Sequence, residues 1–163
     1  MTVVVVAEDD ADLRALLTKV VARAGFKVVD AADGRAALAA ARDPLVGAVA
    51  CDVGLPLVSG VQLCRRLRAE FPDRHLPILL LSGAAGERHR DEALAAGADD
   101  YLVKPFRMET LTRRLARLID PTATVRLSPG SAADLAGRAA LYQARHRIED
   151  WTEGWTEPRR ATA

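Results

Sequence analysis

Five short apolar runs divide the chain, and each is too short to form a helix. Several of them are rich in valine and isoleucine, the β-branched residues that favour strands. We therefore predict five buried strands. The runs cover residues 3–7, 28–31, 48–51, 78–81 and 101–103.

Between and after these runs, apolar residues recur at the spacing of an amphipathic helix. These periodic segments cover residues 13–20, 36–41, 61–67, 93–96 and 108–118. Asp10 is well placed to cap the first helix, and Gly25 and Gly97 can end helices. Strand and helix thus alternate five times along the chain.

This alternation predicts an α/β fold, a doubly wound flavodoxin-like sandwich. Strands joined by helical crossovers run parallel, and their continuous apolar sequence suits burial on both faces. We expect a five-stranded parallel sheet in the order 2-1-3-4-5. Ligands of such folds bind beyond the carboxyl ends of the strands, near the point where the strand order reverses.

The length of 163 residues, half of them hydrophobic, allows one sizeable core with an extension. We predict a domain over residues 1–120, a linker over 121–130 and an extension over 131–163. The linker contains two prolines and a glycine. Cys51 and Cys64 lie in apolar segments without metal-binding spacing, and we expect both to be buried free thiols.

The charges are balanced, with 23 basic against 22 acidic residues. This balance gives no reason to expect a nucleic-acid partner. The N-terminus lacks the basic start of a signal peptide, and no apolar run approaches membrane-spanning length. We expect a cytoplasmic protein with no membrane association.

Five polar residues follow or end predicted strands, and they should meet at one edge of the sheet. Crowded carboxylates repel one another unless a cation binds, and Mg²⁺ or Mn²⁺ suits such oxygen ligands. A carboxylate beside the metal can attack a phosphoryl group, and a hydroxyl and an ammonium can hold the phosphoryl oxygens. These five residues are Glu8, Asp9, Asp52, Ser82 and Lys104.

Five short motifs occur in order along the chain: VAEDD at 6–10, DVGLP at 52–56 with Gly60, LSG at 81–83, GADDY at 97–101 and KPF at 104–106. With these motifs the chain resembles the receiver domains of two-component response regulators. The resemblance covers about residues 2–120. It implies a domain that catalyses only its own phosphorylation and dephosphorylation, and is otherwise not an enzyme.

The resemblance implies a role for each matching residue. Asp52 would accept a phosphoryl group from a histidine kinase or phosphotransfer protein. Glu8, Asp9 and Asp52 would bind the metal, together with the backbone carbonyl of Gly54. Lys104 would bind phosphate and precede a cis peptide bond to proline.

The resemblance further implies that Ser82 and Tyr101 form a switch pair. After phosphorylation, Ser82 would move toward the phosphate and Tyr101 would turn inward, changing the surface of the fourth helix, fifth strand and fifth helix. Gly54 and Ala84 depart from the commonest pattern of the family. Neither side chain can orient a hydrolytic water, so we expect slow self-dephosphorylation.

The spacing of apolar residues in the extension predicts one amphipathic helix. Leu141, Ile148 and Trp151 on its apolar side form a possible partner interface. Its apolar stripe can pack on the domain, on a homodimer partner or on an unknown output protein. The extension is too short to form a winged-helix DNA-binding domain, so we expect signalling through protein–protein contacts. The alternative is a nucleic-acid-binding transcriptional regulator that uses the arginine-containing tail.

Overall fold

The computed structural model describes residues 1–122. Almost all of the predicted linker, and the extension with Leu141, Ile148 and Trp151, lie outside the described residues. The elements, in chain order, are β1 (Val3–Ala7), α1 (Ala11–Arg23), β2 (Lys27–Ala31), α2 (Gly34–Ala41), β3 (Val46–Asp52), α3 (Gly60–Glu70), β4 (Ile78–Ser82), α4 (Glu87–Ala95), β5 (Asp100–Val103) and α5 (Met108–Ile119).

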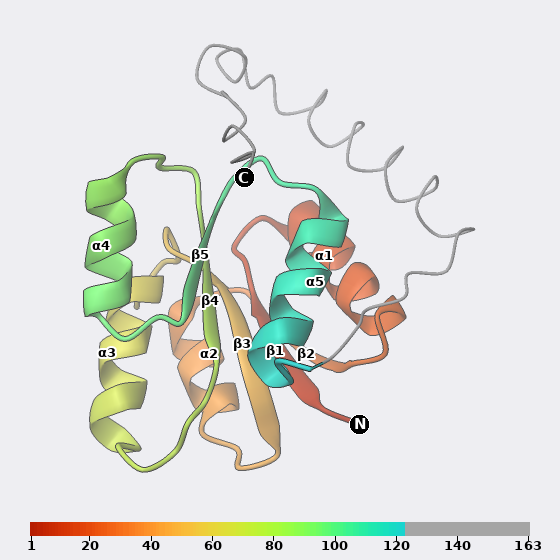
Figure 1. The fold of residues 1–163 in the computed structure, drawn as a ribbon, viewed down its shortest axis with the longest axis horizontal. Helices are drawn as coiled ribbons and strands as arrows, with labels where there is room; N and C mark the ends of the chain where they lie inside the picture. The colour runs from red at the N-terminus through yellow and green to blue at the C-terminus, as the bar shows by residue number, and fades with distance from the viewer. Residues whose placement is uncertain (123–163) are drawn as a thin grey trace, which may run out of the picture.

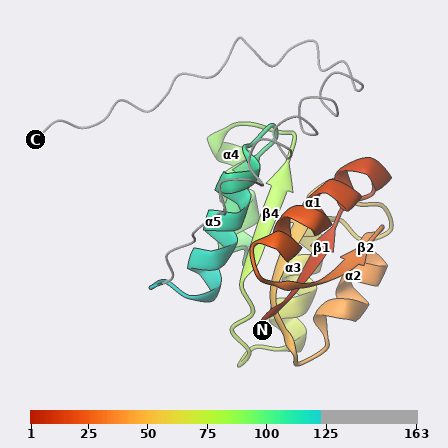
Figure 2. The same cartoon turned by 90° about the vertical axis from the view of Figure 1, so that its right-hand side faces the viewer.

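The five strands form one parallel sheet in the order β2-β1-β3-β4-β5. Helices α1 and α5 cover one face, and α2, α3 and α4 cover the other (Figure 1). A view from the side shows α1 and α5 next to each other on their face (Figure 2). The predicted doubly wound sandwich and its strand order are confirmed.

Each face of the sheet has its own hydrophobic core, because alternate residues of a strand point to opposite faces. In β1, Val5 packs with the core under α2, α3 and α4, whereas Val4 and Val6 pack with the core under α1 and α5. All five residues of β4 are buried. The continuous apolar strands of the sequence are therefore explained by helices on both sides.

The predicted helix boundaries agree with the local hydrogen bonding. The Asp10 side chain accepts a hydrogen bond of 2.8 Å from the Leu13 N–H at the start of α1. Gly25 and Gly97 follow α1 and α4 with φ angles of 96° and 101°, which favour glycine after a helix. Both helices therefore end where the sequence predicts.

Helix α4 extends well before its apolar segment. The apolar spacing in the sequence covers residues 93–96, whereas α4 begins at Glu87. Ala93 is its one buried residue, and the first turns are polar and exposed. A helix with so narrow an apolar face has little of the periodicity from which helices are predicted.

Cys51 and Cys64 are both free thiols in the core, as predicted. Burial raises the pKa of both thiols, that of Cys64 to about 12. Since the thiolate is the reactive form, iodoacetamide should leave both unmodified in the native protein at mildly alkaline pH, and modify both in guanidinium chloride. Intact mass measures this difference. Rapid labelling of either cysteine in the native protein would contradict the buried placement.

Within residues 1–122, the structure has no helix that is long and apolar enough to span a membrane.

Candidate functional site at the carboxyl edge of the sheet

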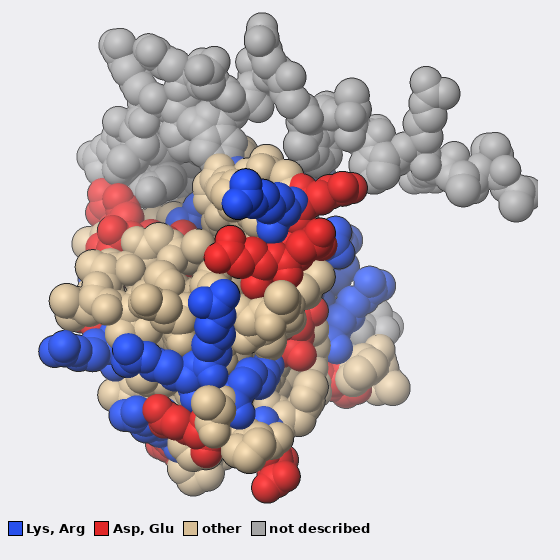
Figure 3. Space-filling model, turned by 90° about the vertical axis from the view of Figure 1, so that its left-hand side faces the viewer, with Lys and Arg blue, Asp and Glu red and all other residues tan. Residues whose placement is uncertain are grey.

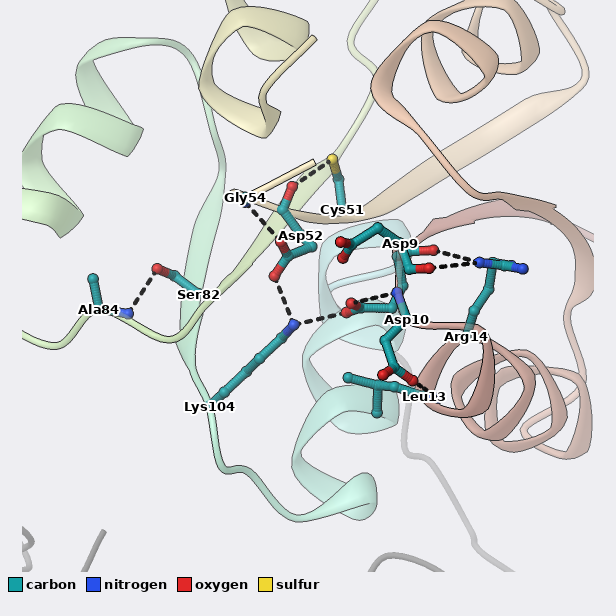
Figure 4. A network of polar contacts seen from close by, with 11 residues as sticks. Asp9, Asp10, Leu13, Arg14, Cys51, Asp52, Gly54, Ser82, Ala84 and Lys104 are labelled. Atoms are coloured by element: carbon teal, nitrogen blue, oxygen red, sulfur yellow. Dashed lines mark hydrogen bonds and ion pairs between the residues drawn. The ribbon is translucent and has the colours of Figure 1, made fainter. Parts of the chain in front are cut away.

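The five polar residues predicted to meet do lie at one edge of the sheet. Asp52 and Ser82 are the last residues of β3 and β4, and Glu8, Asp9 and Lys104 directly follow β1 and β5. Figure 4 shows Asp9, Asp52 and Lys104 directed toward one another, with Ser82 to one side, where its hydroxyl faces Ala84. The five residues come from the ends of four strands. Glu8, Asp52 and Ser82 are buried. The parallel arrangement of the strands thus assembles one polar site from distant parts of the sequence.

The Lys104 ammonium joins two of the carboxylates. Its Nζ lies 2.7 Å from Glu8 Oε2 and 2.6 Å from Asp52 Oδ1. The peptide bond from Lys104 to Pro105 is cis, as the resemblance implies. The ammonium offsets the repulsion between the two carboxylates, which would otherwise be costly in a buried site.

The second oxygen of Asp52 is held by the backbone of the following loop. Gly54 N–H donates a hydrogen bond of 2.6 Å to Asp52 Oδ2. Gly60, at the start of α3, packs so closely that a Cβ atom there would lie 2.6 Å from the Asp52 carbonyl oxygen. Both ends of the loop are therefore fixed against the end of β3. Ligation of a metal by the Gly54 carbonyl stays a prediction.

The carboxylates are close enough to share a metal ion. Glu8, Asp9 and Asp52 each offer an oxygen, and these oxygens lie within 4.8 Å of one another. Asp9 is exposed, whereas Glu8 and Asp52 are buried, so the group opens to solvent on one side. A mostly carboxylate site with room for water suits Mg²⁺. The residues present therefore fit a hard divalent cation.

Burial and charge act against each other on the ionisable groups. Burial raises the pKa of Glu8, and the hydrogen bond and charge of Lys104 only partly offset this. For Lys104, burial lowers the pKa, but hydrogen bonds to Asp52 and Glu8 outweigh it, so that the pKa is raised overall. The site thus keeps a charged ammonium beside a carboxylate whose ionised form is disfavoured.

Ser82 and Tyr101 meet at the backbone of Ala84, in the loop between β4 and α4. The Ser82 Oγ accepts a hydrogen bond of 3.0 Å from Ala84 N–H, and the Tyr101 hydroxyl donates one of 2.7 Å to the Ala84 carbonyl. Tyr101 is buried. The predicted pair is therefore connected through one loop residue, with Tyr101 inward in this structure; a movement on phosphorylation stays a prediction.

Arg14 also contacts this edge, although the sequence patterns do not point to it. Its Nη1 donates to the backbone carbonyls of Glu8 and Asp9, at 2.8 and 3.3 Å (Figure 4). Its Nε lies 3.3 Å from Asp30 Oδ2. Because its partners at the site are backbone atoms, no side-chain motif reveals the contact. The one available signal is its place on the first turns of the helix that follows the acids.

Together these groups can carry out chemistry on a phosphoryl group. A carboxylate with one oxygen facing an ammonium and a cluster of acids can act as a nucleophile once a metal is present. The ammonium and a hydroxyl are suitable partners for the phosphoryl oxygens.

Comparison with known proteins gives the family. The sequence profile of the response regulator receiver domain matches residues 4–116. The chain is 38% identical over 116 residues to the transcriptional regulatory protein PrrA of Mycobacterium tuberculosis, which is 71% of this chain and 49% of that relative. The chain thus spans about half the length of this curated relative.

Two solved structures show the same fold. The chemotaxis protein CheY4 of Vibrio cholerae has a TM-score of 0.67 and 33% identity, covering 72% of this chain and 98% of that one. The receiver domain of the sensor histidine kinase PA1611 of Pseudomonas aeruginosa has a TM-score of 0.66 and 31% identity, covering 72% and 97%. That protein carries a magnesium ion in its active site cleft. The chain described here belongs to the response regulator receiver family, the phosphoacceptor regulatory domains of two-component signalling.

Proposed function

We propose that this chain is a phosphorylation switch that accepts a phosphoryl group on Asp52 from a histidine kinase or phosphotransfer protein. One observation carries the proposal. A buried carboxylate at the ligand-binding edge of the sheet contacts the Lys104 ammonium at 2.6 Å and lies beside the acids Glu8 and Asp9. Such an arrangement is costly for stability and is explained by a function in phosphoryl transfer.

Each group has a part in the proposed reaction. Glu8, Asp9 and Asp52, with the Gly54 carbonyl, would hold Mg²⁺ or Mn²⁺, which neutralises charge on the phosphoryl oxygens when bound. An Asp52 oxygen attacks phosphorus, and the new O–P bond forms as the P–N bond of the donor phosphohistidine breaks. The histidine nitrogen leaves with the bonding electrons. Lys104 then contacts a phosphoryl oxygen.

The response would begin at the loop after β4. The Ser82 hydroxyl would exchange its contact with the Ala84 N–H for one to the phosphoryl group, and the loop would follow. Tyr101 would stay with the loop because its hydroxyl is bound to the Ala84 carbonyl. We infer that the changed surface of α4, β5 and α5 then signals to an output protein or a second copy of the chain.

Incubation with acetyl phosphate tests this function. With Mg²⁺ present, the intact mass should increase by one phosphoryl group, and excess EDTA should prevent the increase, because the carboxylates cannot approach an uncompensated phosphoryl dianion. Size-exclusion chromatography of the same samples separates the two kinds of output. A larger species on phosphorylation indicates self-association. Failure to label with Mg²⁺ would contradict the proposal.

The phosphorylated form should be long-lived, with a half-life of minutes or longer. Gly54 and Ala84 have no side-chain group that could orient a water for attack on phosphorus. The decay of the labelled mass after removal of acetyl phosphate measures the half-life. Gly54→Asn supplies an amide that can orient such a water, and it should shorten the half-life. The new Cβ would lie 3.0 Å from Asp52 Oδ2 and must displace that oxygen slightly. A half-life of seconds in the unsubstituted chain would contradict this expectation.

Transcriptional regulation is a second candidate, favoured by the description of PrrA as a transcriptional regulatory protein. The face formed by α3 and α4 carries both basic and acidic side chains and is not a continuous basic surface (Figure 3). This face alone therefore does not favour nucleic-acid binding, and the candidate would use the arginine-containing extension. Binding of a random DNA duplex that weakens steeply with salt would support this candidate, and no binding at low salt would exclude it.

A further inference from the structure

The Arg14 side chain binds the backbone carbonyls of the turn that carries Glu8 and Asp9, away from their carboxylates. We propose that Arg14 is a positioning residue: through the carbonyls of this turn it holds the two carboxylates toward Asp52, and so sets the affinity of the site for Mg²⁺. The inference rests on the proposed metal site, and it concerns a residue that contacts neither the phosphoryl group nor the metal.

Arg14 and the end of β2 together hold the backbone of the turn at Glu8 and Asp9. Arg14 Nη1 donates to the Glu8 carbonyl at 2.8 Å and to the Asp9 carbonyl at 3.3 Å, so that one nitrogen joins two successive residues. Arg14 Nε contacts Asp30 Oδ2 at 3.3 Å. The Glu8 N–H donates to the carbonyl of Ala31, the neighbour of Asp30 in β2, at 3.1 Å. Both backbone polar groups of Glu8, its N–H and its carbonyl, are therefore held by hydrogen bonds.

The two cations at this site act on different atoms. Lys104 binds the carboxylate oxygens of Glu8 and Asp52, the atoms that a metal would use. Arg14 binds the carbonyl oxygens of the turn, so the Glu8 carboxylate remains in contact with Lys104 and the Asp9 carboxylate remains near Asp52 (Figure 4 shows Arg14, Asp9 and Asp52). Its guanidinium is rigid and planar, which suits the orientation of a turn better than a flexible ammonium does. Partners of this kind orient metal ligands without touching the metal.

A positioning role and a simple charge effect predict opposite results. Arg14 is a cation near an acidic site, so removing its charge would by itself strengthen the binding of Mg²⁺. If Arg14 positions the acids, removing it allows the repelling carboxylates to separate, and the binding weakens. The sign of the change in affinity therefore distinguishes the two roles.

Calorimetric titration of Mg²⁺ into the full chain tests the proposal. We expect Arg14→Gln to raise the Kd by about tenfold or more, as the loss of such orienting partners does. Arg14→Lys keeps the charge, so a loss of affinity there reports geometry alone, and we expect an intermediate Kd. Arg42→Gln is the matched control. It removes an arginine that pairs with Glu70 at 2.8 Å, at the opposite end of α2 from the site, and should leave the Kd unchanged.

A Kd for Arg14→Gln equal to or below that of the unsubstituted chain would overturn the proposal. Amide NMR spectra without metal provide a second measurement. The resonances of Glu8 and Asp9 should shift in Arg14→Lys, with those of α3 and α4 unchanged, and no shift at these two residues would also overturn the proposal. If the unsubstituted chain bound no Mg²⁺, the proposed metal site would be wrong, and the amide shifts would still show whether Arg14 orients the turn that carries Glu8 and Asp9.

Discussion

Lys104→Met is expected to slow phosphorylation by acetyl phosphate about a hundredfold or more, the usual cost of losing one donor that stabilises transition-state charge. The same substitution is expected to strengthen Mg²⁺ binding. The Lys104 ammonium contacts Glu8 Oε2 at 2.7 Å and Asp52 Oδ1 at 2.6 Å, so it would compete with a cation for these oxygens. Methionine keeps the apolar stem and removes that competition.

Two measurements check this pair of effects. Intact mass against time gives the rate of phosphorylation at saturating Mg²⁺, and calorimetry gives the Kd for the metal. Lys27→Met is the matched control, because Lys27 is exposed at the start of β2, away from the site. Phosphorylation of Lys104→Met at the unsubstituted rate would contradict the role of the ammonium. A weaker affinity for Mg²⁺ would contradict the competition.

Glu8→Gln is expected to stabilise the domain at neutral pH when no metal is bound. It is also expected to weaken Mg²⁺ binding about tenfold or more, because it changes a direct metal ligand, and even the loss of a residue that only orients such a ligand lowers metal affinity by about this factor. Burial raises the pKa of Glu8, so its ionised form is disfavoured by folding. Glutamine has nearly the same shape without the charge. Lys104 keeps its contact to Asp52 in the variant, and no buried ammonium is left without a partner.

The effect of Glu8 on stability has a defined dependence on pH. A raised pKa means that the folded state binds the proton more tightly than the unfolded chain. The free energy of unfolding therefore falls as the pH rises from the ordinary carboxyl value of 4.5 through the raised pKa. Glu8→Gln lacks this loss, so its advantage over the unsubstituted chain should be greater at neutral than at acidic pH.

Thermal unfolding in EDTA, at neutral and at acidic pH, measures the difference in melting temperature between Glu8→Gln and the unsubstituted chain. Glu92→Gln is a suitable control, because Glu92 is exposed on α4. A lower melting temperature for Glu8→Gln than for the unsubstituted chain at neutral pH would show that the Glu8 carboxylate stabilises the fold. That result would contradict the expected cost of keeping an acid in this buried position.

Most of the fold could be predicted because the sheet is covered on both sides. A strand such as β4, with every residue buried, must be apolar throughout, and such runs are easily found. Strand starts were predicted less well where they are polar. β2 begins at exposed Lys27 and β5 begins at Asp100, and neither residue has a side chain that favours strands on composition alone. In helix α4 the apolar spacing marks only the last turns, for the related reason that the first turns have no buried side chain.

The members of the candidate site were predictable for a topological reason. The carboxyl ends of parallel strands share one edge, so polar residues that follow strands must meet there. The sequence could not show how they pair. That Lys104 joins Glu8 to Asp52, or that Tyr101 is bound to a carbonyl in the next loop, depends on side-chain conformations. Arg14 was missed because it recognises the backbone.

Chemical trapping of the phosphorylated residue tests the central claim most directly. After treatment with acetyl phosphate and Mg²⁺, borohydride reduces an aspartyl phosphate to homoserine, and peptide mass spectrometry locates the change. We predict a single modified site, Asp52, and no incorporation into Asp52→Asn. Modification of Asp9 or Asp10 in place of Asp52, or undiminished labelling of Asp52→Asn, would contradict the assignment of Asp52 as the phosphoacceptor.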